Sequence, residues 1–324
     1  KVVLMTAVIA HHVAQAYGPT GGWWPVQEPT RAAILGPFFM VNRSFGMSLF
    51  FMIAGYFTVA SFEKSGPRAF VKSRLLRLGI PLLVFSFLVL LLQVFVFGPM
   101  DTGELGALWP IDVGHLWFVQ HLIIYSLGYA LWRVLRPAAS LSEKPANPPG
   151  YGTVLAFAAG LALCTAIIRT WFYIDEWVYI FGYIRIAFAD VPRDLGLFIV
   201  GTLAYRHQWV TRFPSREGRV WLAVGLVLAG FWYAYELWLR DFVVVSDTVL
   251  GLLVPLWESL LCCGMCIGLT VLFRDMVNAQ GPVAREMAKG TYAAYMIHIF
   301  IVLLFQYLAI GLIAPPFLKF LLVT

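Results

Sequence analysis

Apolar segments long enough to cross a lipid bilayer recur along the whole chain, and they constrain its fold more than any other feature. A transmembrane α-helix needs about 20 mostly apolar residues to cross a hydrocarbon core about 30 Å thick. Such segments lie at 1–17, 38–61, 75–97, 115–132, 152–170, 192–208, 219–239, 247–273 and 289–310, with a partial one at 312–324. The pattern predicts an all-α polytopic membrane protein of about ten helices, in which 170–192 is the hardest region to assign.

The composition agrees with this class of protein. The chain is 60% hydrophobic and 12% charged, whereas soluble domains are about 25% charged. We see no internal repeat and no soluble domain, so 1–324 is interpreted as one membrane-embedded domain. We expect it to be clipped at both ends, because it starts without methionine and stops inside an apolar stretch. The Pro- and Ala-containing stretch 137–150 is interpreted as a flexible cytoplasmic loop.

The distribution of charge orients the helices, since cytoplasmic loops carry an excess of Lys and Arg. Loops on the side of Lys1 hold most of the basic residues, namely Lys64, Arg68, Lys72, Arg74, Arg77, Arg133, Arg136, Lys144, Arg206, Arg212, Arg216, Arg219, Arg274, Arg285 and Lys289. The opposite side holds most of the acids, and the amino end is therefore predicted to be cytoplasmic. The net charge of +6 is explained by contacts with anionic membrane lipids. Nucleic-acid binding is excluded, because no soluble basic module is present.

His12 is the most informative single residue, because it lies in the first apolar segment. An ionisable group at membrane depth is costly unless it is paired or used, so it is a functional-site hypothesis by default. His12 is eleven positions after Lys1, which is about 16 Å along a helix and close to the middle of a bilayer core. Histidine titrates near neutral pH, so His12 is predicted to move a proton there. The adjacent His11 points about 100° away on a helix, so only one of the two is expected to face a site.

Arg74 and Arg77 share one face of the helix that enters the membrane from the first basic loop. Guanidinium groups in this arrangement suit bidentate binding of phosphate. The alternative is that both arginines only anchor the topology, which is common for juxtamembrane arginine. Cys263 and Cys266 have a CxxC spacing, but they lie in an apolar segment and are expected to be buried small side chains rather than a metal or redox site.

Five motifs in order resemble the integral-membrane acyltransferase family 3. Members of this family typically show Arg or Lys eleven positions before a His, a Phe-Phe-x-x-x-Gly-Tyr-Phe segment and an Arg-x-x-Arg before Leu and Pro, followed by a His-Leu-Trp-Phe element and a Tyr-rich element with a late His. The matching positions in this chain are Lys1 and His12, Phe50 to Phe57, Arg74, Arg77 and Pro81, His115 to Phe118, and Tyr292, Tyr295 and His298. The resemblance covers essentially the whole chain.

The resemblance implies an O-acyltransferase in the bacterial inner membrane that moves an acyl group, often acetyl or succinyl, from cytoplasmic acyl-CoA. Acceptors in the family are typically hydroxyl groups of glycans, glycolipids or other small molecules of the cell envelope. It also implies His12 as catalytic base, Arg74, Arg77 and Lys1 as donor-binding residues, acyl-CoA as co-substrate, and no permanently bound cofactor or metal. Lys1 departs from the commoner Arg, and lysine keeps the charge but lacks the guanidinium fork.

The chemistry of acyl transfer fits these residues. A neutral imidazole suits removal of an alcohol proton near pH 7, and the tetrahedral oxyanion needs nearby donors. His298, Tyr295 and backbone amides are the candidate donors. His12 could instead become acylated itself, so direct transfer and an acyl-histidine route both stay open.

Counting along the helices puts His298 and Glu258 at a depth similar to that of His12. A carboxylate on one ring nitrogen would fix the histidine tautomer, as in hydrolase triads. Glu258 and His298 are therefore further candidate catalytic residues. The alternative for Glu258 is that it faces a water-filled cavity or pairs with a tyrosine elsewhere.

Several outer residues are candidates for the acceptor pocket. These are His115, Trp117, Trp23, Trp24 and Tyr295. The alternative for the histidine and the tryptophans is an interfacial anchor, because aromatic residues form belts at membrane surfaces. Arg43 and Glu236 are expected to be structural partners or to line a cavity.

Two other functions fit the same polar residues. A transporter of a glycan or lipid precursor also needs intramembrane charges, although the internal repeats typical of transporters are not visible. The remaining alternative is an inactive sensor or scaffold, which the presence of His12, Arg74 and Arg77 disfavours.

Overall fold

The computed structural model describes residues 1–19, 24–97, 111–136, 146–242, 246–277 and 281–324. A helix occupies each of the apolar segments expected from the sequence. The helices are α1 (Val2–Tyr17), α2 (Leu35–Ser65), α3 (Pro67–Arg74), α4 (Ile80–Phe97), α5 (Trp117–Leu135), α6 (Tyr151–Ile168), α7 (Val191–Arg206), α8 (Trp209–Arg212), α9 (Ser215–Ala234), α10 (Asp247–Met276), α11 (Pro282–Ala309) and α12 (Pro316–Val323). Short π-helical turns at Leu75–Gly79 and Tyr235–Leu239 extend α3 and α9.

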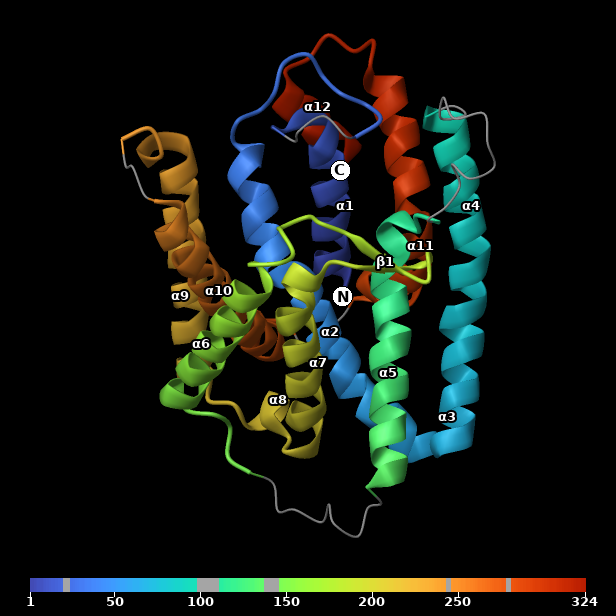
Figure 1. Ribbon diagram of the computed structural model, residues 1–324, viewed down its shortest axis with the longest axis vertical. Helices are drawn as coiled ribbons and strands as arrows, with labels where there is room; N and C mark the ends of the chain where they lie inside the picture. The colour runs from blue at the N-terminus through green and yellow to red at the C-terminus, as the bar shows by residue number, and fades with distance from the viewer. Residues whose placement is uncertain (20–23, 98–110, 137–145, 243–245, 278–280) are drawn as a thin grey trace.

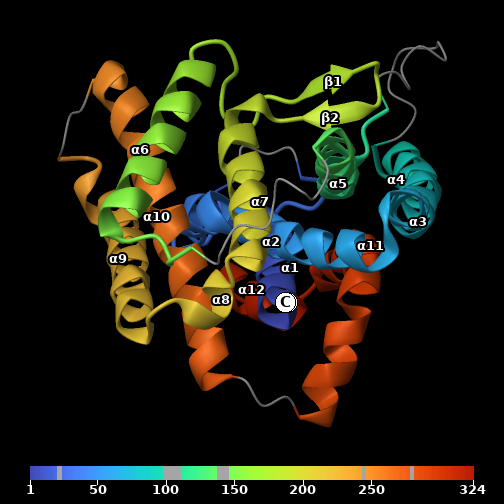
Figure 2. The same ribbon diagram turned by 90° about the horizontal axis from the view of Figure 1, so that it is seen from below.

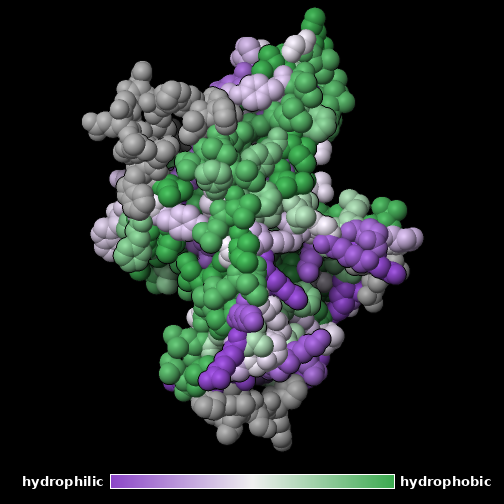
Figure 3. All heavy atoms as spheres, turned by 90° about the vertical axis from the view of Figure 1, so that its right-hand side faces the viewer, coloured by the Kyte–Doolittle hydropathy of each residue, from purple (hydrophilic) through white to green (hydrophobic). Residues whose placement is uncertain are grey.

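Within the described ranges, six helical stretches are long and apolar enough to cross a membrane. They are Leu35–Ser65, Pro67–Gln93, Tyr151–Ile168, Ser215–Leu239, Thr248–Met276 and Pro282–Ala309, while α1 is apolar but shorter. The face that carries α4 is covered largely by hydrophobic side chains (Figure 3), and Leu83, Val84 and Phe87 on this helix are exposed. An exposed apolar face of this kind suits contact with lipid tails. The expectation of an all-α polytopic membrane protein is therefore confirmed.

The helices form two groups on either side of α1 and α2 (Figures 1 and 2). One group contains α6, α9 and α10, and the other contains α3, α4, α5 and α11. In the middle, α2 packs very closely against α7, because glycines lie at the crossing. A Cβ at Gly55 would collide with the backbone oxygen of Phe198, and a Cβ at Gly201 would collide with that of Met52. Glycine on each of the two helices thus lets their backbones approach.

The region 170–192, which the sequence left hardest to assign, contains a small β-hairpin. Strands β1 (Val178–Ile180) and β2 (Ile184–Ile186) are antiparallel, with Val178 opposite Ile186. Gln120 of α5 fixes the hairpin from below, because its amide donates to the Tyr183 carbonyl (2.9 Å) and its oxygen accepts from the Arg185 backbone N–H (3.1 Å). The hairpin lies across the end of α5 and beside the entrance to α7 (Figure 2). It is the one departure from a purely helical architecture within the residues that the structure describes.

Candidate active site

A cavity of about 380 Å³ lies between α1, α2, the start of α5, the hairpin and the start of α7. One wall carries the imidazoles of His11, His12 and His115 with the indole of Trp24. A second wall is rich in Arg and Asp side chains, and Trp117 and Trp177 also line the space. The cavity therefore combines titratable rings, paired charges and flat aromatic surfaces.

Three histidine rings meet at the first wall. The ring of His12 lies 5.1 Å from that of His298, which in turn lies 4.9 Å from that of His115 (centroid distances). The Nδ1 of His298 is 2.6 Å from the Tyr295 carbonyl, and the Nε2 of His115 is 3.3 Å from the Met296 carbonyl. The Tyr295 hydroxyl donates to the His115 carbonyl. The structure thus brings together His12, His115, Tyr295 and His298, four residues that the sequence analysis singled out separately.

The neighbouring histidines of α1 point to different partners, as helical geometry requires. The Nδ1 of His11 is 3.2 Å from the side-chain nitrogen of Asn42 on α2, and the same amide also donates to the Ala7 carbonyl at 3.3 Å. His12 instead faces α11 and His298. His11 is therefore engaged with a helix–helix contact, whereas His12 belongs to the histidine cluster.

A tryptophan and a glutamine hold α1 in place beside this cluster. The Trp24 indole stacks on the His12 ring at a centroid distance of 5.7 Å, and its N–H donates to the Gln306 side-chain oxygen at 2.8 Å. The Gln306 amide donates to the Val13 carbonyl at 3.1 Å. Gln306 is fully buried on α11. Sequence reasoning missed Gln306, and the signal that could have found it was an uncharged polar residue in an otherwise apolar stretch.

The course of α1 gives the position of His12 along the height of the molecule. The amino end of α1 lies at mid-height of the molecule, and the helix rises from there towards α12 (Figure 1). His12 is about 16 Å further along, so it lies nearer to the end of the molecule that carries α12.

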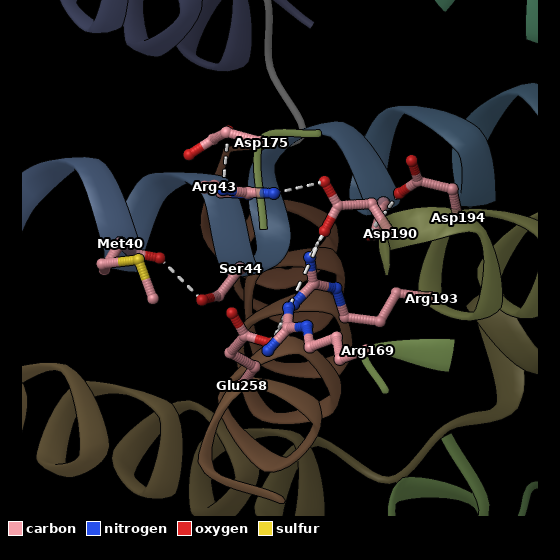
Figure 4. A network of polar contacts seen from close by, with 10 residues as sticks. Met40, Arg43, Ser44, Arg169, Asp175, Asp190, Arg193, Asp194 and Glu258 are labelled. Atoms are coloured by element: carbon pink, nitrogen blue, oxygen red, sulfur yellow. Dashed lines mark hydrogen bonds and ion pairs between the residues drawn. The ribbon is translucent and has the colours of Figure 1, made fainter. Parts of the chain in front are cut away.

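The second wall is a network of ion pairs that joins four helices and the hairpin region (Figure 4), and its members are largely buried except Asp175, whose side chain is 75% exposed. Arg43 of α2 pairs with Asp190 at 2.8 Å and with Asp175 at 2.7 Å. Arg193 at the start of α7 pairs with Asp190 at 2.5 Å and with Glu258 of α10 at 2.7 Å. Each charge has an opposite partner, which offsets the large cost of removing ions from water.

Glu258 belongs to this network rather than to the histidine cluster. Its carboxylate lies 2.7 Å from Arg169 and 2.7 Å from Arg193, and the side chain is 0% exposed. The contact between Glu258 and His12 that depth counting suggested is therefore not present in the structure. Depth was a poor guide here, because it says nothing about the direction in which a helix presents its side chain.

Asp194 has a different environment from the other acids of the network. It accepts a hydrogen bond from the Ser48 hydroxyl at 2.7 Å, is 3% exposed, and lines the cavity. Among the described residues it forms no ion pair within 4.0 Å. Near the hairpin, Arg185 pairs with Asp112 at 2.5 Å and lies 4.1 Å from the Trp177 ring. These cavity residues were not recognised from the sequence as parts of a site.

Two of the three residues expected to bind the donor contact neighbouring residues of α2. The Arg74 guanidinium is 3.4 Å from the Thr58 hydroxyl, and the Lys1 ammonium is 4.9 Å from the ring of Phe57, the preceding residue. Arg77 is exposed in the π-helical turn Leu75–Gly79. The outer candidate Trp23 lies outside the described residues, whereas Trp24 and Trp117 both line the cavity.

Comparison with known proteins gives a family match over the whole chain. A family model described as "Acyltransferase domain" matches residues 1–324. Proteins named glucans biosynthesis protein C from Salmonella paratyphi A, Salmonella agona and Salmonella heidelberg are each 24% identical over 317 residues, which is 91% of this chain and 78% of theirs. No solved structure matches the chain.

Proposed function

Given that the chain belongs to the acyltransferase 3 family and is a multi-pass membrane O-acyltransferase, we propose that it moves an acyl group such as acetyl from cytoplasmic acyl-CoA to a glycan hydroxyl. Its relatives are bacterial, which assigns it to the inner membrane. The observation that carries the proposal is the position of His12, which lines the cavity and whose ring lies 5.1 Å from that of His298, itself in contact with His115. A proton acceptor on the wall of a polar cavity is what transfer to a hydroxyl needs.

The proposal also requires that the donor-binding end of the protein faces the cytoplasm. The turn from α2 to α3, the end of α5 and α8 gather at the lower end of the molecule in Figure 1 and carry Lys64, Arg68, Arg133 and Arg212. The positive-inside rule makes this end cytoplasmic. We infer that α1 runs away from the cytoplasm and that ten helices cross the membrane.

Binding of the donor near Arg74, Arg77 and Lys1 is supported by distances along α2. Arg74 contacts Thr58, and His11 contacts Asn42; at about 1.5 Å per residue, these two levels of α2 are about 24 Å apart. This separation is comparable to an extended pantetheine arm with its diphosphate. Basic side chains near the cytoplasmic end would hold the phosphates, while the thioester reaches towards His12.

A glycan acceptor is supported by the names of the relatives and by the second wall of the cavity. Sugars offer hydroxyl groups for charged and polar partners and apolar faces for aromatic rings. Asp194 and Arg185 provide the first kind of contact, and Trp117 and Trp177 provide the second. The hairpin carries Arg185 and follows Trp177, so it would help to shape acceptor specificity.

The reaction then balances with His12 as the base. Its ring takes the hydroxyl proton as the oxygen attacks the thioester carbonyl, and the tetrahedral intermediate collapses by breaking the C–S bond. The leaving thiolate takes the proton back from His12, so ester and free CoA thiol are the products. In the alternative route the His12 nitrogen itself attacks the thioester, and the acceptor hydroxyl then displaces it.

The test is transfer of labelled acetyl from acetyl-CoA to glucan by the purified protein in proteoliposomes, whose two compartments also reveal transport. His12→Ala should lower the rate by about 10²-fold to 10⁴-fold, the range for removal of a general base, while binding of acetyl-CoA is kept. His207→Ala is the matched control, because His207 lies outside the cavity and contacts the backbone N–H of Ala146. Full activity of His12→Ala would remove His12 from the mechanism. Movement of unmodified glucan across the membrane without acylation would favour a transporter instead.

A further inference from the structure

We propose that His298 is a positioning residue that fixes the tautomer of His12. In this arrangement the Nδ1–H of His12 donates to the Nε2 of His298, and the Nε2 of His12 is left as the base that faces the acceptor. The proposal rests on the proposed function and assigns a specific role to a residue behind the cavity wall.

The tautomer of His298 follows from its backbone contact. Its Nδ1 lies 2.6 Å from the Tyr295 carbonyl oxygen. A carbonyl oxygen only accepts, so this nitrogen carries the hydrogen, and in a neutral imidazole the other nitrogen is then an acceptor. The Nε2 of His298 is buried and has no hydrogen-bond partner within the described part of the chain. The lone pair on the Nε2 of His298 is therefore buried and accepts no hydrogen bond from the described residues.

The complementary group lies on the neighbouring ring. The Nδ1 of His12 is also buried without a hydrogen-bond partner among the residues that the structure describes. The centroids of the two rings are 5.1 Å apart and the rings are tilted by 46°, and this separation permits a hydrogen bond between two ring nitrogens. Buried polar groups are almost always paired, and a single hydrogen bond from His12 to His298 satisfies both of these atoms.

The third histidine of the cluster is held in another way. The Nε2 of His115 lies 3.3 Å from the Met296 carbonyl and must therefore carry its hydrogen. The hydroxyl of Tyr295 holds the His115 backbone carbonyl as well. Two consecutive carbonyls of α11, those of Tyr295 and Met296, thus set the tautomers of His298 and His115. His12 is the member of the cluster that no carbonyl fixes among the described contacts, which leaves this task to His298.

The contacts from the Tyr295 carbonyl through His298 to His12 have the role that the carboxylate has in a hydrolase triad. Unlike the carboxylate, His298 carries no charge. In a triad, the carboxylate holds the histidine in the correct tautomer and supports the imidazolium that forms. Here the acid at similar depth, Glu258, is held by Arg169 and Arg193. A neutral partner suits this wall, because a buried carboxylate without a cation would be costly. When His12 takes the hydroxyl proton, the Tyr295 carbonyl and the His298 ring together support the positive ring.

Two matched substitutions test the proposal. The side-chain amide of His298→Gln reaches the position of Nε2 and offers an oxygen to His12, whereas that of His298→Asn reaches only the position of Nδ1. We expect turnover to fall by about 10²-fold or more in His298→Ala and His298→Asn. His298→Gln should recover at least about tenfold of this loss. The KM for acetyl-CoA should stay unchanged in all three variants, and acetyl-CoA binding shows that each is folded. Equal loss in Gln and Asn variants would overturn the proposal.

A spectroscopic readout decides the tautomer without measuring activity. In protein labelled with ¹⁵N-histidine, the His12 signals are identified by their loss in His12→Gln. We expect the Nδ1–H tautomer in the wild type and a change to Nε2–H, or to a mixture, in His298→Ala. A His12 spectrum that is identical in wild type and His298→Ala would contradict the proposal. If the wild type shows no transfer at all, the proposed function fails, but the tautomer spectrum still decides this inference.

Discussion

Arg43 of α2 and Asp190 at the start of α7 are 147 positions apart in the chain, yet their side chains lie 2.8 Å apart in the interior. This contact joins the two helices that pack most closely, and both of its residues line the cavity together with His12. The same Asp190 also binds Arg193. One acid therefore links the packing of the bundle to the shape of the cavity.

Removing one partner of a buried ion pair in this network should lower the stability of the fold. Arg193 is 1% exposed and Glu258 is 0% exposed, and removing one partner of a buried ion pair costs about 3–5 kcal/mol. We expect Glu258→Ala to lose about this much stability in thermal unfolding in detergent. The triple variant Arg169→Met/Arg193→Met/Glu258→Met should lose less than Glu258→Ala, because Asp190 keeps its ion pair with Arg43 and no uncompensated charge is left.

The control for this prediction is an exposed pair. Lys289 and Glu286 are 66% and 70% exposed, and exposed ion pairs contribute about 1 kcal/mol or less. Glu286→Ala should therefore leave the unfolding temperature nearly unchanged. An equal loss from Glu286→Ala and Glu258→Ala would show that the network does not stabilise the bundle.

The helices of this protein could be predicted from the sequence, whereas the contacts between them could not. A run of apolar residues is a local signal, so the span from 38 to 61 predicted α2 within a few residues. The hairpin after Trp177 has no such signal, because its strands are only three residues long and depend on Gln120.

The candidate site shows the same division. Counting along helices predicted that His12 and His298 lie at similar depth, and the structure brings their rings together. The same counting could not show that Glu258 faces Arg169 and Arg193, because the direction of a side chain depends on how distant helices pack. The roles of these residues in catalysis stay predictions.

Asp194 should contribute to acceptor binding rather than to donor binding. Its carboxylate lines the cavity and is held by the Ser48 hydroxyl. In Asp194→Asn, we expect the KM for glucan to rise by about tenfold, which corresponds to about 1.4 kcal/mol, with little change in the KM for acetyl-CoA. Asp275→Asn is the control, because Asp275 pairs with Arg274 outside the cavity. A rise in the KM for acetyl-CoA alone would contradict an acceptor role.

Arg74 and Arg77 should determine the affinity for acyl-CoA. The double variant Arg74→Ala/Arg77→Ala is expected to weaken acetyl-CoA binding by at least about tenfold, because hydrogen bonds to charged groups contribute about 1.5–3 kcal/mol each. Replacement of both by Lys should restore only part of the affinity, since lysine lacks the planar fork. Calorimetry or fluorescence titration measures the Kd.

The matched control for the donor site is Arg136→Ala, because Arg136 is exposed at the end of α5 and is part of the same basic end of the protein. It should bind acetyl-CoA as the wild type does. Equal weakening by Arg136→Ala would mean that general basic charge, rather than a defined site, attracts the donor.

The last prediction concerns the close crossing of α2 and α7, where only glycine fits. In Gly201→Ala the new Cβ would meet the backbone oxygen of Met52, and the helices would have to separate. Overpacking of this kind costs about 1–3 kcal/mol, and it would also shift Arg193 and Asp194 at the start of α7.

Gly230→Ala in α9 is the control, since no atom of another segment lies within 4 Å of the position that its Cβ would take. This variant should be neutral or stabilising by up to about 1 kcal/mol. Thermal unfolding and acetyl transfer are measured on both variants, and a Gly201→Ala protein as stable and active as Gly230→Ala would show that the crossing is looser than the structure indicates.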